Sequence, residues 1–398
     1  MQILRYLIFL PNITFSLVPA EIFPWALVYS FFKERKIYIG LIPVLLLIFF
    51  SSFYTLYLTN GSELSNVFRV SFAYLNPLIL FVVLIRADEQ EIIKIINCLK
   101  NIFFGLLILG TLQTLNLIDF LDPIFKTMVP RSSAGSLADY DRGVTLLSSE
   151  PSRAGLELLL IYACYRACSS INFKKIILLD FIVICFQIFI IQSATGVLVS
   201  LLFFLYLYKY IALLFSPFII LFILESASES RLIYIATELI QSVTFLEFMN
   251  LLIDFSGFRG TSVLSAYYYG VNNFFGGGLG LWEVSSIEAL KSLGIDPGKY
   301  TYYREYSNGL YLEARPEAYM ANVALDFGIL GLCIYFIFLY PFIKMIFLIG
   351  KVIFPISLLF FFIIFLSGSV GNPVPWIAFA LTIQYFKFKD QAIQIYEK

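Results

Sequence analysis

Hydrophobic residues in this chain form long, almost unbroken runs separated by short polar stretches. A membrane-spanning helix needs about 20 mostly apolar residues. Runs that approach this length cover residues 37–58, 67–86, 101–118, 153–169, 176–191, 194–208, 210–224, 318–343, 350–369 and 374–387. Residues 1–32 are also apolar, but Pro11, Pro19 and Pro24 interrupt them, which predicts one kinked span or two short helices. The pattern predicts about 11 or 12 transmembrane helices.

Composition supports this prediction. Hydrophobic residues make up 60% of the 398 residues and charged residues 14%, whereas soluble domains are about 25% charged. The mean hydropathy of +0.86 excludes a water-soluble fold, a disordered chain and a porin-type barrel. We therefore expect an all-α, polytopic membrane protein in which residues 1–398 form a single integral membrane domain, with the lipid bilayer as its surroundings.

The basic residues predict the orientation of the spans, because cytoplasmic loops are enriched in Lys and Arg. More than half of the 27 basic residues fall on one side when the spans alternate: Lys33, Arg35, Lys36, Arg86, Lys94, Lys100, Arg166, Lys174, Lys175, Lys209, Lys344, Lys351, Lys387, Lys389 and Lys398. This places the C-terminus in the cytoplasm. It also places two long segments outside, 119–152 and 225–316, which carry more than half of the acidic residues.

Charge and residue types narrow the chemistry. Twenty-seven basic residues balance 27 acidic ones, so there is no basic excess for nucleic acid, and no nucleic-acid partner is expected. Histidine is absent, which excludes His-based acid–base catalysis and His-ligated metal. Asp139 and Asp141 form an Asp-x-Asp pair, which binds a metal in nucleotide-sugar transferases. Nucleotide-sugar donors are absent outside the cell, so we expect neither a metal nor a cofactor.

The first external segment ends in charged residues immediately before the span 153–169. Pro151 is suited to the first turn of that helix, and Ser149 or Glu150 could cap it. Alternatively, Glu150 is a carboxylate held at the membrane surface beside Arg142 and Arg153. The sequence leaves both interpretations open.

The second external segment combines guanidinium, aromatic and glycine residues. Arg259 can bind phosphate bidentately, and the aromatic faces of Tyr268 and Trp282 suit sugar rings. The alternative is a surface loop with aromatic residues at the membrane interface. Arg315 and Glu317 close the segment at the mouth of the span 318–343, where a plain interfacial anchor is the alternative interpretation.

Taken together and in order, these stretches resemble the O-antigen polymerase (Wzy-type) family, within the group that includes O-antigen ligases. The likeness covers nearly the whole chain, although each motif alone is weak. The motifs are Arg142-Gly143 through Glu150-Pro151-Ser152 to Gly155, Gln192-Ser193-Ala194-Thr195-Gly196, Arg259 to Gly270 with ten residues between them, Asn273-Phe274-Phe275-Gly276 to Gly280, and Asn322 through Asp326-Phe327-Gly328 to Leu332.

The resemblance implies a membrane-embedded, inverting glycosyltransferase with a GT-C-like fold. Its substrate would be an oligosaccharide repeat unit on undecaprenyl diphosphate, polymerised at the periplasmic face of the bacterial inner membrane. A chain-length regulator and a flippase of the same pathway are the expected partners. The diphosphate and sugars would contact Arg142, Arg153, Arg259, Arg315, Tyr268 and Trp282. The base for the attacking hydroxyl would be Glu317, ranked ahead of Glu150 and Asp141.

One difference from the family pattern helps to decide between a polymerase and a ligase. O-antigen ligases carry a His about eleven residues before the glycine that matches Gly328, and Glu317 stands there in this chain. This favours a polymerase over a ligase. The functions of a lipid-linked oligosaccharide flippase and of a capsule or exopolysaccharide polymerase also remain open.

Overall fold

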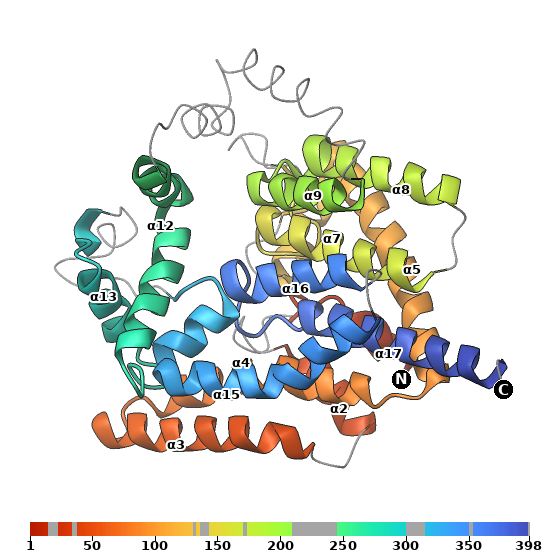
Figure 1. Ribbon diagram of the computed structural model, residues 1–398. Helices are drawn as coiled ribbons and strands as arrows, with labels where there is room; N and C mark the ends of the chain where they lie inside the picture. Colours follow the sequence, from red (N-terminus) through yellow and green to blue (C-terminus); the bar gives the residue numbers. More distant parts are fainter. Residues whose placement is uncertain are drawn as a thin grey trace.

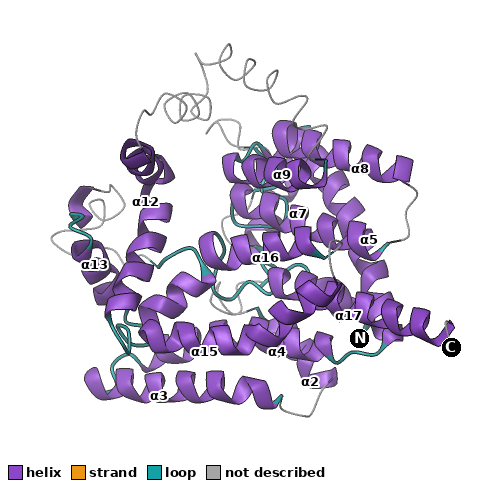
Figure 2. Ribbon diagram, in the orientation of Figure 1, coloured by secondary structure: helices purple, strands orange, loops and turns teal. Residues whose placement is uncertain are grey.

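The computed structural model describes residues 1–14, 23–33, 38–129, 133–135, 143–169, 173–208, 245–299, 315–349 and 353–396. Every regular element within these ranges is helical (Figures 1 and 2). The longer helices are α2 (Pro24–Lys33), α3 (Ile42–Leu58), α4 (Leu64–Ile85), α5 (Glu89–Thr114), α7 (Pro151–Cys168), α8 (Phe173–Phe186), α9 (Ala194–Leu207), α12 (Phe245–Asn272), α13 (Trp282–Ser292), α15 (Tyr319–Ile349), α16 (Phe354–Leu366) and α17 (Val374–Tyr396).

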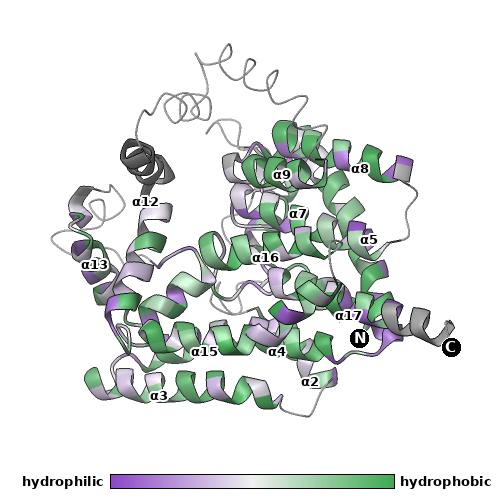
Figure 3. Cartoon of the chain, viewed as in Figure 1, coloured by the Kyte–Doolittle hydropathy of each residue, from purple (hydrophilic) through white to green (hydrophobic). Residues whose placement is uncertain are grey.

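Four helical segments of the described chain are long and apolar enough to cross a membrane: Ile39–Leu58, Leu64–Ile85, Glu89–Thr114 and Tyr319–Phe347. Two shorter apolar helices, Thr195–Leu207 and Phe354–Leu366, accompany them. Apolar residues dominate along α3, α9 and α16 (Figure 3). The expectation of an all-α protein with several membrane-spanning helices is therefore confirmed. The run 210–224 lies outside the described residues.

The N-terminal residues form two short helices, α1 (Gln2–Leu7) and α2, on either side of residues 15–22, which are not described. A buried carboxylate joins both helices to α5. Glu91 accepts hydrogen bonds from Arg5 at 2.7 and 2.8 Å and from the Tyr29 hydroxyl at 2.9 Å, and Lys33 Nζ lies 2.8 Å from it. This cluster stabilises the packing of the N-terminal helices.

Aromatic side chains fill the centre of the bundle formed by α4, α15, α16 and α17. Phe360 stacks on Phe379 with ring centroids 4.3 Å apart, and Phe81 stacks on the same ring at 6.0 Å. Trp376 packs edge-on against both Phe81 and Phe360. Such pairs add to the free energy of apolar burial and fix how the helices cross. These contacts join α4, α16 and α17.

Helix α15 is broken at Gly328, whose φ of 64° and ψ of −156° lie in a region that is open essentially only to glycine. The loop after α12 fills the break. Ile329 N donates to Asn273 O at 3.2 Å, and Gly277 N donates to Leu325 O at 2.8 Å. A Cβ on Gly328 would lie 2.1 Å from Asn273 O. The two glycine-containing motifs of the sequence therefore interlock through their backbones.

The sequence also suggested a surface loop around residues 258–270, and this expectation is wrong. These residues belong to α12, a helix of 28 residues that packs mainly against α15 and α13. Gly270 allows the close packing, because a Cβ there would lie 2.4 Å from Ala324 O of α15. The spacing of Arg259 and Gly270 is consequently a helical spacing, with Arg259 about three turns before the contact.

Candidate functional site

The start of α7 determines where the first charged residues lie. Pro151 occupies the first turn, as expected, and Glu150 is the N-cap residue with extended backbone (φ −153°, ψ 149°). Its side chain makes no capping hydrogen bond. The carboxylate is instead directed to another helix, so the simple capping interpretation describes the backbone of Glu150 but not its side chain.

Arg259 of α12 connects two carboxylates from distant parts of the chain. Its Nη2 donates to Glu150 Oε2, and its Nε lies 3.1 Å from Glu317 Oε2. Its Nη1 donates to Ser152 Oγ at 3.2 Å. The planar guanidinium thus contacts three side chains at once through different nitrogen atoms. The single ammonium nitrogen of a lysine does not offer this planar set of donors.

Arg153 completes the charged cluster from the first turn of α7. Its Nη2 lies 3.6 Å from Glu317 Oε1, and its Nη1 donates to Ser149 Oγ at 3.2 Å. Burial opposes ionisation of Glu150, but the charges of Arg259 and Arg153 outweigh it and lower its pKa. The side chains remain accessible, with 46% of Arg259, 30% of Arg153 and 28% of Glu317 exposed. Charged groups that are paired yet accessible can exchange partners with a ligand.

The turn between α16 and α17 supports the other side of the cluster. Gly368 N donates to Glu317 O at 2.7 Å, which fixes the backbone of Glu317 against this turn. Tyr267 of α12 donates to Phe365 O at 2.7 Å, which ties α12 to the end of α16. A small pocket results, lined by Ser152, Arg153, Leu156, Glu157, Leu160, Arg259, Glu317, Ile363, Ser367, Gly368, Ser369, Asn372 and Pro375.

Arg315 does not belong to this cluster, although we expected it beside Glu317. It points in a different direction, where its Nε donates to Asn322 Oδ1 at 2.8 Å and its Nη2 lies 3.8 Å from Asp326 Oδ2. Its guanidinium lies 4.8 Å from the ring centroid of Trp282. Only 11% of its side chain is exposed. The guanidinium is therefore part of a buried network.

The remaining expected site residues fall into two groups. Trp282 is 3% exposed beneath Arg69 and Arg315, so its ring is a packing surface, whereas Tyr268 is 48% exposed on α12. Asp141 and Arg142, like Asp139, lie outside the described residues. Their proposed roles remain predictions from the sequence.

Glu157 is a pocket residue that the sequence did not single out, as are Ser367, Ser369 and Asn372. It follows Glu150 by seven positions and Arg153 by four, so all three lie on one face of α7. Asn372 Nδ2 donates to it at 2.9 Å and Asn12 Nδ2 at 3.3 Å. A carboxylate at this helical spacing inside an apolar run is the signal that could have identified it.

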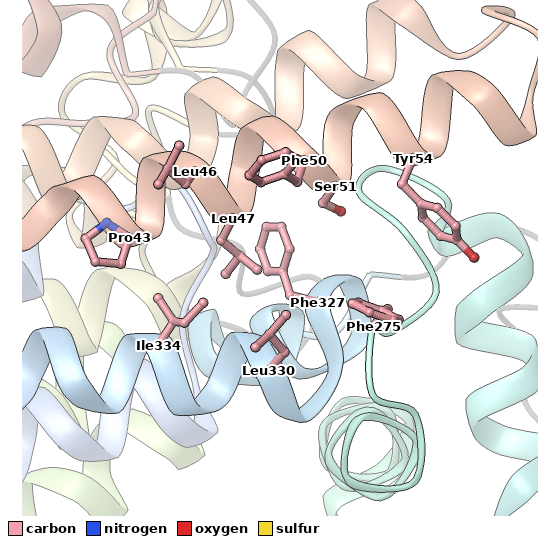
Figure 4. A pocket seen from close by; sticks show the side chains of 10 residues that line it. All are labelled: Pro43, Leu46, Leu47, Phe50, Ser51, Tyr54, Phe275, Phe327, Leu330 and Ile334. Carbon is pink, nitrogen blue, oxygen red and sulfur yellow. The ribbon is translucent and has the colours of Figure 1, made fainter.

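Two apolar cavities lie between helices. One of about 420 Å³ runs along α9 and α16, from Pro355 to Leu366. Helix α16 also borders the charged pocket, through Ile363 and the C-cap residue Ser367. The other, of about 560 Å³, lies between α3 and α15, where Phe50, Phe327 and Leu330 face one another (Figure 4).

The described residues contain no group of three or more His, Cys, Asp or Glu side chains able to hold a metal ion. Among the described residues of the pocket, Arg153 and Arg259 offer positive charge to an anionic ligand, assisted by the N-terminus of α7. Comparison with known protein families, curated proteins and solved structures finds no match for this chain. The site is accordingly interpreted from its own geometry and from the motifs of the sequence.

Proposed function

We propose that this protein is a glycosyltransferase that polymerises oligosaccharide repeat units carried on undecaprenyl diphosphate, in the manner of an O-antigen polymerase. The observation that carries the proposal is a cluster of accessible arginines and carboxylates in a pocket bordered by α16, a helix that also lines an apolar cavity. Arg153 and Arg259 come from segments far apart in the chain and meet at Glu317, which contacts the turn after α16. A substrate with an anionic diphosphate and a long apolar tail would need both features together.

In this proposal the two arginines bind the diphosphate, and Glu150 and Glu317 hold them in position before the substrate arrives. The acceptor hydroxyl oxygen attacks C1 of the donor sugar, and the bond between C1 and the diphosphate oxygen breaks. The electron pair of that bond leaves with the lipid diphosphate, where the guanidinium groups stabilise its charge. The proton of the hydroxyl passes to a base. Attack opposite to the leaving group inverts the configuration at C1.

The finer architecture is also a proposal. We propose 11 or 12 transmembrane helices in a GT-C-like arrangement, located in the bacterial inner membrane. The segments 119–152 and 225–316 would face the periplasm, where Arg259 and Glu150 would meet lipid-linked substrates. The C-terminus would then be cytoplasmic, in agreement with the distribution of Lys and Arg.

The orientation can be tested by labelling single cysteines in a variant that lacks the five native ones. Val271, which is 57% exposed near the end of α12, and the exposed Lys389 of α17 are suitable positions. A membrane-impermeant maleimide should label Val271→Cys in intact spheroplasts and Lys389→Cys only after the membrane is opened. Labelling of both from the same side would contradict the proposed topology.

The function itself is tested by deleting the gene and examining the surface glycan by electrophoresis. A polymerase predicts that lipid-bound glycan persists as single repeat units and that the ladder returns when the gene is restored. Loss of all surface glycan would instead indicate a flippase, and long polymer that is not attached to its acceptor would indicate a ligase. A defect confined to capsule or exopolysaccharide would retain the chemistry but change the product.

A further inference from the structure

The proposed reaction needs a proton acceptor, and the sequence had ranked Glu317 first. The geometry of Glu317 argues against that assignment. Its Oε1 faces Arg153 Nη2 at 3.6 Å and its Oε2 faces Arg259 Nε at 3.1 Å. Glu150 is engaged in the same way, since its Oε2 accepts from both Arg259 and Ser152. Both carboxylates are therefore already paired with guanidinium groups, which suits them to hold the arginines in position.

Glu157 differs from these two carboxylates in its partners. Its hydrogen bonds come from neutral groups, namely the amides of Asn12 and Asn372 and the hydroxyl of Ser148. Its Oε1 accepts from Asn372 at 2.9 Å and from Asn12 at 3.3 Å, and its Oε2 accepts from Asn12 at 3.3 Å. Both contacts from Asn12 are long for hydrogen bonds, so a substrate hydroxyl can displace this amide from Oε2.

The amide that holds Glu157 most closely has a fixed orientation. Asn372 Oδ1 accepts a hydrogen bond from Val374 N at 2.9 Å, at the start of α17. Its Nδ2 must therefore point to the other side, where Glu157 Oε1 lies. This arrangement orients the carboxylate through neutral donors, and a general base must be held within hydrogen-bond reach of the proton that it takes.

The position of Glu157 also fits this role. It lines the same pocket as Arg153, Arg259 and Glu317. It lies seven residues after Glu150, or about 10 Å further along α7 at 1.5 Å per residue. Ionisable residues among apolar helices are costly and are usually retained for function.

We propose that Glu157 is the general base of the transfer reaction. The inference rests on the proposed function, because it concerns the same pocket. The acceptor hydroxyl donates its proton to Glu157 Oε2 as its oxygen forms the new bond to C1 of the donor sugar. The bond from C1 to the lipid diphosphate breaks, and its electron pair leaves with the diphosphate bound by Arg153 and Arg259. Glu157 afterwards releases the proton to solvent.

The test is Glu157→Gln in the full-length protein, reconstituted in vesicles with lipid-linked single repeat units extracted from the deletion strain. Gln retains the size of Glu and accepts the Asn12 and Asn372 hydrogen bonds through Oε1, but it does not take up a proton. We expect kcat to fall by at least about 100-fold, the lower end of general-base effects. The KM for the lipid-linked unit should change little, because Arg153 and Arg259 remain.

Glu157→Asp and Glu317→Gln make the result specific. Glu157→Asp keeps a carboxylate and should retain more activity than Glu157→Gln, whereas a purely structural role would make the shorter side chain the more damaging. Glu317→Gln should mainly raise KM, because Glu317 orients the arginines. Glu157→Gln protein that polymerises at the wild-type rate would overturn the assignment of the base but leave the function standing. Wild-type vesicles that make no polymer would instead refute the proposed function.

Discussion

Arg315 and Glu317 are two positions apart in the chain, but they belong to two different clusters of arginine and carboxylate side chains. The cluster of Arg315 is buried, and the cluster of Glu317 is partly accessible to solvent. Arg315 meets Asp326, Tyr74 and Trp282, and its side chain is 11% exposed. Glu317 meets Arg153 and Arg259 in a pocket where the arginines remain partly accessible. The two clusters therefore contain the same residue types and differ in how far their side chains are buried.

The difference has an energetic basis. A buried ion pair is strongly destabilised when one partner is removed, because the other charge is left without compensation. An accessible pair contributes little to the free energy of unfolding, because water replaces the lost partner. Accessible charges can consequently serve a ligand. We therefore expect Arg315 and Asp326 to contribute to stability, whereas Arg153 and Arg259 are the residues that bind the ligand in the proposed function.

The largest expected effect is a loss of stability, caused by the substitution Asp326→Asn. This change leaves the Arg315 guanidinium buried without its counter-charge and weakens the hydrogen bond from the Tyr74 hydroxyl, which is 2.8 Å long. The loss should be about 3–5 kcal/mol. The midpoint of thermal unfolding in detergent measures it. The matched change in the accessible cluster, Glu317→Gln, should cost less than about 1 kcal/mol. Equal shifts for both variants would remove the distinction between the clusters.

The next largest expected effect is a loss of polymerisation activity, caused by the substitution Arg259→Lys. Lysine keeps the charge but lacks the planar set of donors that reaches Glu150, Glu317 and Ser152. The rate of polymerisation should fall by about 100-fold or more, as when a donor to developing charge is removed. The length distribution of the glycan and the initial rate in vesicles both report it.

Arg166→Lys serves as the control for this substitution. Arg166 pairs with Asp180 between α7 and α8, with 3.0 Å between Nε and Oδ1. This variant should polymerise at the wild-type rate even if its unfolding temperature decreases. Wild-type ladders from Arg259→Lys protein at normal expression would show that the planar guanidinium is not needed.

The smallest expected effect is the contribution of Glu150 to stability, which should depend on pH. The folded protein holds the pKa of Glu150 below the ordinary value of 4.5. A lowered folded pKa stabilises the fold above the unfolded value, and this contribution is lost as the pH falls through the folded value. Glu150→Gln should therefore be less stable than wild type at neutral pH, by under about 1 kcal/mol. The difference should disappear as the pH falls through the lowered folded pKa of Glu150. A difference that stays constant with pH would indicate a packing defect rather than loss of the ion pair.

The hydrophobic runs predicted most of the helices, because burial in a membrane requires length and apolarity, and both are visible in a sequence. Helix α7 begins at Pro151 and α9 at Ala194, as expected from the local residues, with Ser193 capping Gly196 N at 3.2 Å. The break of α15 at Gly328 was not predicted. It depends on backbone groups of residues 273–277, which lie much earlier in the chain.

The candidate site was predicted only in part, for a similar reason. Arg153, Glu150 and Glu317 were each identified as charged residues at the outer ends of helices, and Arg259 as a residue of the second external segment. Their pairing could not be inferred, since Arg259 and Glu150 are 109 positions apart in the chain. Arg315 looked equivalent to Arg259 in sequence, and only the contacts of α15 with α4 and α13 distinguish them.

The break in α15 has a consequence for how the protein inserts into a membrane. Residues Ile329–Ile349 alone rise roughly 30 Å, enough to cross the hydrocarbon core. The segment before the break can thus remain near the surface while the later half spans. The loop that completes the break is synthesised before α15, so its backbone partners are already present when Gly328 leaves the ribosome. Substitutions at Gly276 or Gly328 should therefore reduce the yield of inserted protein before any effect on catalysis can be measured.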